Sequence, residues 1–178
     1  MTTRTLGPAL TARRSRRSEF FSFPDPVNEV SARLVAGGVV VMTVPALILD
    51  EHAVWLLAIL AYGFVARVLT GPTMSPLGQF VTRVVTPRLG LGFRPVPGPP
   101  KRFAQAMGVA FSISALALTL AGEDLAARVV LALLLTAAVL ESIVALCLGC
   151  VVFGVLMRAG IVPDSVCERC NNLALRSL

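Results

Sequence analysis

Four long apolar segments constrain the fold of this chain more than any other feature of its sequence. About 20 apolar residues let a helix cross the ~30 Å hydrocarbon core of a bilayer. Because an open sheet would leave backbone groups unpaired in lipid, each segment is expected to be a helix. Only 15% of the residues are charged, too few to cover the surface of a soluble domain. The sequence therefore predicts an all-α integral membrane four-helix bundle, with helices over residues 31–49, 53–70, 103–121 and 125–158.

Charged residues predict how this bundle is oriented. The arginines gather in an arm over residues 1–25, in the long loop between the second and third segments, and in a tail over residues 161–178. The two short hairpin loops hold acids and His52. Since basic loops stay on the cytoplasmic side, both termini are predicted to be cytoplasmic around a membrane domain of residues 26–160. The basic arm, predicted to be disordered, lies next to apolar segments and so favours anionic lipid over nucleic acid as its partner.

Two charged side chains interrupt the apolar segments at similar depth. Counted at about 1.5 Å per residue, Arg67 and Glu141 both fall in the cytoplasmic leaflet. A buried charge there costs several kcal/mol unless it is paired, so we expect an Arg67–Glu141 ion pair that Gln105 could join. In the alternative, Arg67 extends to the lipid headgroups and Glu141 is protonated or bonded to a hydroxyl. A structural role for this cluster is favoured over a proton relay.

Small side chains recur every four residues on the third segment, at Ala104, Gly108 and Ser112. Such a stripe lets the backbone of a neighbouring helix approach closely. We expect it to be a packing seam.

Four cysteines form two identical spacings, Cys147-Leu-Gly-Cys150 and Cys167-Glu-Arg-Cys170. A C-x-x-C pair brings two sulfurs within reach of each other for thiol–disulfide chemistry or for metal binding. The first pair is expected near the C-terminal end of the fourth helix, where the helix dipole and apolar surroundings disfavour a thiolate. Helical spacing also points Glu141 away from this pair. The tail pair is better placed for reactivity if Asp164 caps a short C-terminal helix.

The same four cysteines fit a second interpretation. Their full pattern, C-x2-C-x16-C-x2-C, lies within the spacing of a tetrathiolate site for zinc or iron. The tail would have to fold back toward the membrane to complete such a site. A third interpretation takes the cysteines as small apolar residues without a chemical role.

Three blocks of the sequence resemble a bacterial membrane family called domain of unknown function 4395. They are Gly98-Pro-Pro-Lys-Arg-Phe-Ala-Gln105, Leu140-Glu-Ser-Ile-Val-Ala-Leu-Cys-Leu-Gly-Cys150 and the early Pro26-Val-Asn28. The resemblance implies a multi-pass protein of the bacterial inner (plasma) membrane whose relatives are associated with thioredoxin-like and rhodanese-like proteins. If these blocks mark a site, they add Asn28, Lys101, Arg102 and Phe103 to Gln105, Glu141, Cys147 and Cys150.

Three functions remain open at this level. The first is a dithiol protein that handles thiols or sulfur with a cytosolic thioredoxin- or sulfurtransferase-like partner and requires no cofactor. The second is a non-enzymatic membrane protein with a structural metal site formed by all four cysteines. The third is a small transporter subunit, which would need a homo-oligomer because four helices enclose little lumen. Whether the protein is an enzyme is left open.

Overall fold

The computed structural model describes residues 23–49, 53–90, 92–163 and 166–167, which form a mostly helical structure. The long helices are α2 (Glu29–Ile48), α3 (Ala53–Thr70), α6 (Gly98–Leu120) and α7 (Asp124–Val139). The shorter helical elements are α4 (Pro76–Phe80), the π-helical turns η1 (Val81–Val85) and η2 (Leu140–Val144), α5 (Thr86–Arg88) and α8 (Leu148–Arg158). Strands β1 (Val27–Asn28) and β2 (Pro95–Val96) pair antiparallel. Most of the predicted basic arm and of the tail lies outside these residues.

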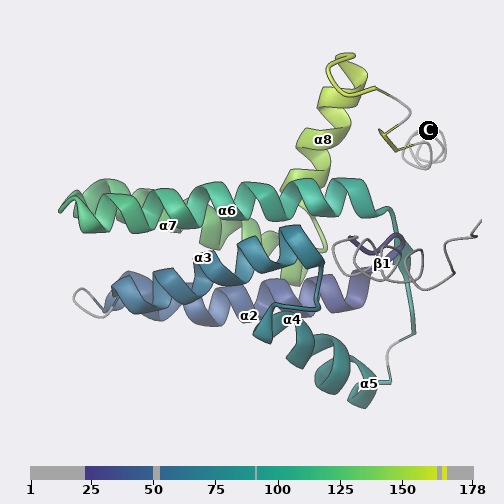
Figure 1. Cartoon of the computed structure of the whole chain (residues 1–178), viewed down its shortest axis with the longest axis horizontal. Helices are drawn as coiled ribbons and strands as arrows, with labels where there is room; N and C mark the ends of the chain where they lie inside the picture. Colours follow the sequence, from purple (N-terminus) through teal and green to yellow (C-terminus); the bar gives the residue numbers. More distant parts are fainter. Residues whose placement is uncertain (1–22, 50–52, 91, 164–165, 168–178) are drawn as a thin grey trace, which may run out of the picture.

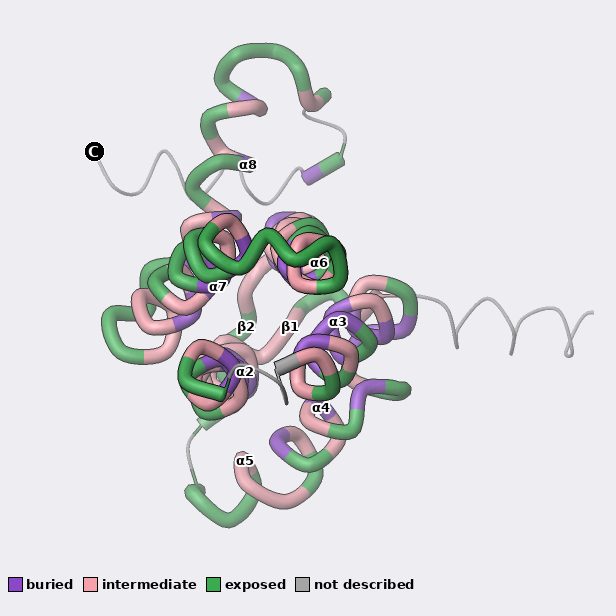
Figure 2. The backbone as a smooth tube through the Cα atoms, turned by 90° about the vertical axis from the view of Figure 1, so that its left-hand side faces the viewer, coloured by how far each residue is buried: buried purple, intermediate pink, exposed green. Residues whose placement is uncertain are grey.

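The long helices α2, α3, α6 and α7 run alongside one another and enclose the core (Figures 1 and 2). Helices α3 and α7 each pack against both α2 and α6. Phe64 and Leu134 are buried together in the middle of this core. A second buried cluster includes Leu57 and Ala115 and lies nearer the hairpin loops. The apolar segments thus pack side by side in the described part of the chain.

Three helical stretches are long and apolar enough to cross a bilayer: Glu29–Ile48, Gly98–Leu120 and Asp124–Val144. Within α3, Val54–Thr70 forms a shorter apolar helical stretch. Large apolar side chains also cover the outside of the long helices, with Trp55 74% and Leu125 78% exposed. A water-facing surface of this kind is unusual, whereas lipid accommodates it. These features are those of a membrane protein.

The predicted fourth helix over residues 125–158 is wrong as a single element. Helix α7 passes through η2 and ends at Ala145, whose φ of 62° is left-handed and stops helical propagation. The chain then restarts as α8 at Leu148. Figure 1 shows α8 projecting across the direction of the long helices rather than extending α7. The apolar composition on both sides of Ala145 hides this break in the sequence.

The stripe of small residues on α6 packs as predicted. The side chain of Phe64 on α3 lies against Gly108 so closely that a β-carbon there would collide with the ring. At Gly149, a β-carbon would lie 2.5 Å from both Cα and Cβ of Ala104. Ser112 is fully buried. The stripe therefore seats α3 on one part of α6 and the start of α8 on another.

A short sheet and the α4–α5 segment complete the end of the molecule that carries α8 (Figure 1). The Asn28 side chain caps α2 by accepting the Val30 amide at 3.1 Å, and it also accepts the Arg94 amide at 3.3 Å. Leu77 of α4 packs against the α2 backbone at Gly38. This end therefore joins the start of α2, the end of α3, the start of α6 and the end of α7.

Substitution of Gly149 by alanine should destabilise the packing of α8 on α6. The added methyl group meets Ala104 Cα and Cβ, which cannot rotate away, so we expect a loss of about 1–3 kcal/mol in unfolding free energy. Gly154→Ala is the matched control, because it lies on the same helix with no atom within 4 Å of the new methyl group. Thermal unfolding in detergent should show a lower midpoint for Gly149→Ala alone. Equal midpoints for the two variants would contradict the close approach of these helices.

Candidate functional site

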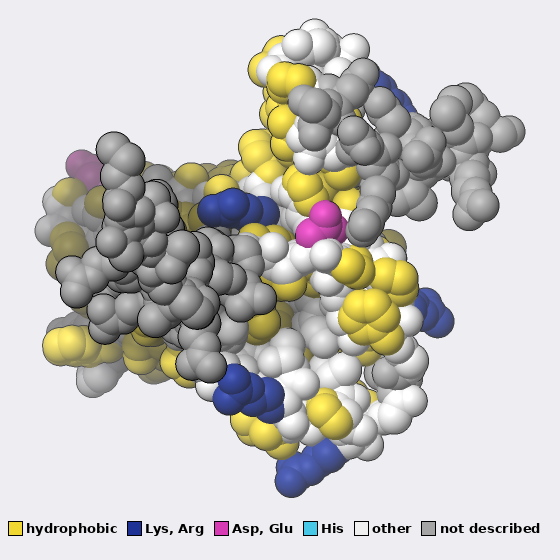
Figure 3. Space-filling view, turned by 45° about the vertical axis from the view of Figure 1, so that its right-hand side comes forward, with side chains coloured by type: hydrophobic (Ala, Val, Ile, Leu, Met, Phe, Trp, Pro, Cys, Tyr) yellow, Lys and Arg dark blue, Asp and Glu magenta, His cyan; other side chains and the backbone are white. Residues whose placement is uncertain are grey.

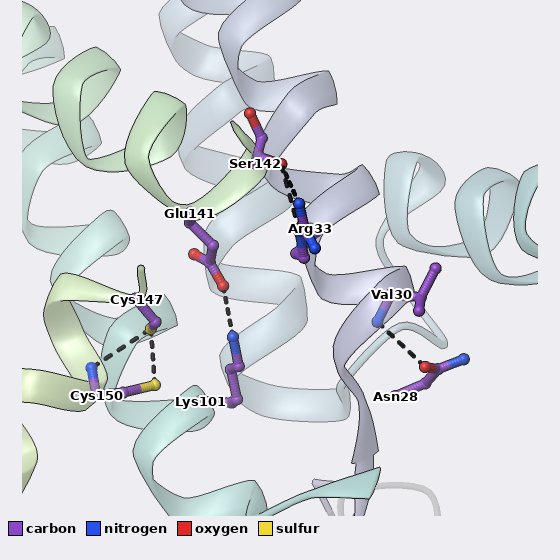
Figure 4. A network of polar contacts seen from close by, with 8 residues as sticks. All are labelled: Asn28, Val30, Arg33, Lys101, Glu141, Ser142, Cys147 and Cys150. Carbon is purple, nitrogen blue, oxygen red and sulfur yellow. Dashed lines mark hydrogen bonds and ion pairs between the residues drawn. The ribbon is translucent and has the colours of Figure 1, made fainter. Parts of the chain in front are cut away.

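Cys147 occupies the N-cap position of α8, and Cys150 lies in its first turn. The Cys147 sulfur accepts the Cys150 backbone N–H at 3.4 Å. The Cys150 thiol donates to the same sulfur, with 2.7 Å between the two Sγ atoms (Figure 4). A disulfide bond has an S–S length of about 2.05 Å, so the two residues form a free dithiol in this structure. The expected position near a helix C-terminus is therefore wrong, because the break at Ala145 places the pair at the start of a helix.

A helix N-terminus favours the thiolate form, since backbone N–H groups and the positive end of the dipole face the sulfur. The hydrogen bond from Cys150 lowers the pKa of the Cys147 thiol below its ordinary value, while burial and Glu141 oppose this shift and Lys101 assists it. The same hydrogen bond, together with burial, raises the pKa of Cys150. The pair is therefore asymmetric: Cys147 is the better nucleophile, and Cys150 keeps its proton.

Glu141 forms its ion pair with Lys101 and not with Arg67. Lys101 Nζ lies 2.7 Å from Glu141 Oε1 (Figure 4). Lys101 sits in the first turn of α6 and Glu141 in η2, so the pair connects the start of one long helix with the end of another. Both side chains are largely buried, 10% and 16% exposed. The predicted Arg67–Glu141 pair is wrong because Lys101 reaches inward to the same carboxylate.

Arg67 is buried at the end of α3 and has neutral partners instead. Its Nε donates to Gln105 Oε1 at 2.8 Å, and its Nη1 donates to Ser75 Oγ at a long 3.5 Å. The guanidinium also stacks over the Phe64 ring, 4.4 Å from the centroid. The expected contact between Arg67 and Gln105 is thus present, whereas the sequence analysis missed Ser75 and Phe64. Ser75 carried one signal, its position before Pro76 at the start of a helix.

A cavity and a cleft meet at Cys147. The cavity, about 180 Å³ in volume, lies inside the helices and is lined in part by Arg67, Gln105, Glu141 and Cys147. The cleft, about 390 Å³ in volume, lies between α8 and the β2–α6 connection and is lined in part by Lys101, Cys147 and Cys150. Glu141 therefore shares a cavity with Cys147, contrary to the expectation from helical spacing.

The remaining predicted residues separate into structural and unassigned groups. Asn28 serves as a helix cap, and Phe103 packs its ring on Phe153 with 5.6 Å between centroids. Arg102 donates to the Val68 carbonyl at 3.2 Å, which connects α6 to α3. Cys167 is buried against α8 and is disulfide-bonded, and Cys170 lies outside the described residues.

Metal binding at this site finds no geometric support within the described part of the chain. No group of three or more His, Cys, Asp or Glu side chains comes together there. Cys147 and Cys150 alone supply two of the four ligands that a structural zinc or iron site requires. The tetrathiolate interpretation also needs Cys170.

Charge substitutions beside Cys147 should shift its reactivity in opposite directions. Lys101→Met removes the charge that favours the thiolate, so the Cys147 pKa should rise and alkylation at neutral pH should slow about threefold or more. Glu141→Gln removes the charge that disfavours it, so the pKa should fall and alkylation should accelerate. Both variants are compared in a Cys167→Ser/Cys170→Ser background, with unfolding midpoints as the control for folding. A shift in the same direction for both variants would contradict the assigned electrostatics.

Comparison with known proteins assigns this chain to a family. No curated protein and no solved structure matches the chain significantly. The model of the family described as Domain of unknown function (DUF4395) matches residues 27–158, which include Asn28, Lys101, Glu141, Cys147 and Cys150. That range covers most of the chain, from β1 to the end of α8. The chain therefore belongs to the DUF4395 family.

Proposed function

We propose that this protein is a four-helix bundle of the bacterial inner membrane with both termini in the cytoplasm. Helix α3 joins the three longer helices as the fourth span, since it packs against both α2 and α6 and is apolar up to Arg67 in its last turn. The end that carries α8 and α5 also bears several Lys and Arg side chains (Figure 3). Arg83, Arg88 and Arg94 belong to this end, and Glu123 and Asp124 belong to the opposite loop. The positive-inside rule therefore assigns the α8 end to the cytoplasm.

Within this topology the protein works as a dithiol that exchanges electrons or sulfur with a cytosolic partner. The observation that carries this proposal is the placement of Cys147 at the N-cap of α8, with the Cys150 sulfur 2.7 Å away. A nucleophilic thiolate beside a protonated resolving thiol is the arrangement that thiol–disulfide exchange requires. The Lys101–Glu141 pair lies close enough to Cys147 to act on its charge: Lys101 favours the thiolate and Glu141 disfavours it. The partner is a thioredoxin-like or rhodanese-like protein that approaches the cleft between α8 and β2.

The exchange step can be written with these two sulfurs. The Cys147 thiolate attacks one sulfur of a partner disulfide, forms a mixed disulfide and displaces the other partner sulfur as a thiolate, which takes up a proton. Cys150 then loses its proton and attacks the Cys147 sulfur, which releases the second partner thiol. The protein is thereby oxidised to the Cys147–Cys150 disulfide by two electrons, and the partner is reduced by two. The reverse reaction uses the same atoms.

Removal of the resolving thiol should trap the partner. Cys150→Ser protein should accumulate a mixed disulfide through Cys147, detected on non-reducing gels. The partner keeps one active-site cysteine, which is first converted to its mixed disulfide with thionitrobenzoate, so that Cys147 attacks the partner sulfur and thionitrobenzoate leaves. Cys147→Ser is the matched control and should trap little, because burial still disfavours the thiolate of the remaining Cys150. Both proteins carry Cys167→Ser and Cys170→Ser so that the tail cannot contribute. Equal trapping by the two variants would exclude the assigned roles. Trapping that appears only when Cys167 and Cys170 are restored would transfer the function to the tail.

A further inference from the structure

A second cavity lies at the same end of the molecule but does not touch the dithiol. Its volume is about 250 Å³, and it is bounded by β1, the start of α2, the end of α3 and the α4–η1 segment. Cys147, Cys150 and Glu141 are absent from its lining. Arg67 and Gln105 line both this cavity and the one that reaches Cys147. The thiol chemistry proposed above leaves this second cavity without a role.

The polar part of its lining is basic or neutral. Two cations, Arg67 and Lys101, reach it, accompanied by the neutral polar side chains Asn28, Ser31, Thr82 and Gln105. No aspartate or glutamate belongs to the lining that the structure describes. Lys101 is neutralised by Glu141, which faces the other cavity. Among the described residues, Arg67 therefore makes no direct ion pair, and Glu141 attracts it only from a longer distance.

Arg67 also retains hydrogen-bonding capacity. A guanidinium has five N–H donors, of which Gln105 and Ser75 use two. Arg67 is only 5% exposed, which limits how much water can reach its remaining N–H groups. Its guanidinium carbon lies over the Phe64 ring, which holds this end of the side chain in place. A buried arginine is costly without an anion, and its terminal nitrogens match the paired oxygens of a carboxylate or a phosphate.

Apolar side chains form the remainder of the cavity wall. Phe23 and Val27 contribute from the N-terminal side, Val35 from α2, and Phe93 from the loop before β2. The volume exceeds what a simple inorganic ion fills. With a cation at one place and an apolar wall elsewhere, the cavity fits a molecule that has one charged end and an apolar body.

We propose that this cavity binds an amphipathic monoanion. Its carboxylate or phosphodiester group contacts Arg67, and its apolar part lies against Val27, Val35 and Phe93. Two sources carry this chemistry: a free carboxylic acid of medium chain length and an anionic phospholipid of the surrounding membrane. The site is independent of the dithiol reaction, so either proposal can fail without the other.

The test uses the full-length chain in nanodiscs of zwitterionic lipid, titrated with octanoate by calorimetry. Saturable binding is expected, with an affinity at least tenfold higher than that of octanamide, which has the same body without the charge. Arg67→Gln should weaken octanoate binding at least tenfold. Arg83→Gln is the matched control, since it removes an arginine outside the cavity lining and should leave the affinity unchanged.

A second variant keeps the test decisive if Arg67→Gln fails to fold. Phe93 is 63% exposed, so Phe93→Ala should fold, and we expect it to weaken octanoate binding about threefold or more through loss of the apolar wall. Nanodiscs with phosphatidylglycerol distinguish the two sources: competition with octanoate identifies a lipid headgroup as the occupant, and unchanged affinity identifies a free acid. Non-saturable uptake, equal affinity for octanoate and octanamide, or equal affinity in all folded variants would overturn the proposal.

Discussion

The break in the chain at Ala145 is the constraint on which the candidate site depends. A continuous helix would place Cys147 and Cys150 on an extension of α7 beyond Val144, toward the helix end at which backbone carbonyls are left unpaired. The left-handed residue ends that helix, and Cys147 instead caps a new one. Its sulfur then faces backbone N–H groups and the positive end of a dipole, which favours thiolate. One backbone dihedral angle therefore decides whether the helix dipole at these two residues disfavours or favours a thiolate.

Two further contacts hold this arrangement in place. The Lys101–Glu141 ion pair fixes the π-helical turn η2 against the start of α6, immediately before the break. The close approach of Gly149 to Ala104 then seats the start of α8 on the same helix. Helix α6 therefore positions both sides of the break. A buried ion pair is weak support for stability but a strong determinant of geometry, because each partner alone would be an unpaired buried charge.

The sequence predicted more of the fold than of the candidate site. Apolar length and turn residues placed the first three long helices and the start of the fourth, although α6 begins earlier than predicted. The spacing of Ala104, Gly108 and Ser112 identified the seam on α6. The break at Ala145 was not predictable from local propensity, since alanine favours helix and its neighbours are apolar. Two consequences of the break were therefore missed as well. Cys147 lies at the start of a helix and not near its end, and Glu141 shares a cavity with Cys147. Resemblance to the family pointed to Lys101, but only the folded chain shows that Lys101, and not Arg67, reaches Glu141.

Titration of the two thiols tests this account most directly. In reduced Cys167→Ser/Cys170→Ser protein, thiolate absorbance followed against pH should rise in two separate steps. We expect the first step below the ordinary thiol pKa of about 8.5 and the second above it, as two sulfurs sharing one proton require. A single step at or above the ordinary value would show that Cys147 does not begin a helix beside a proton-donating Cys150, and would contradict the central claim.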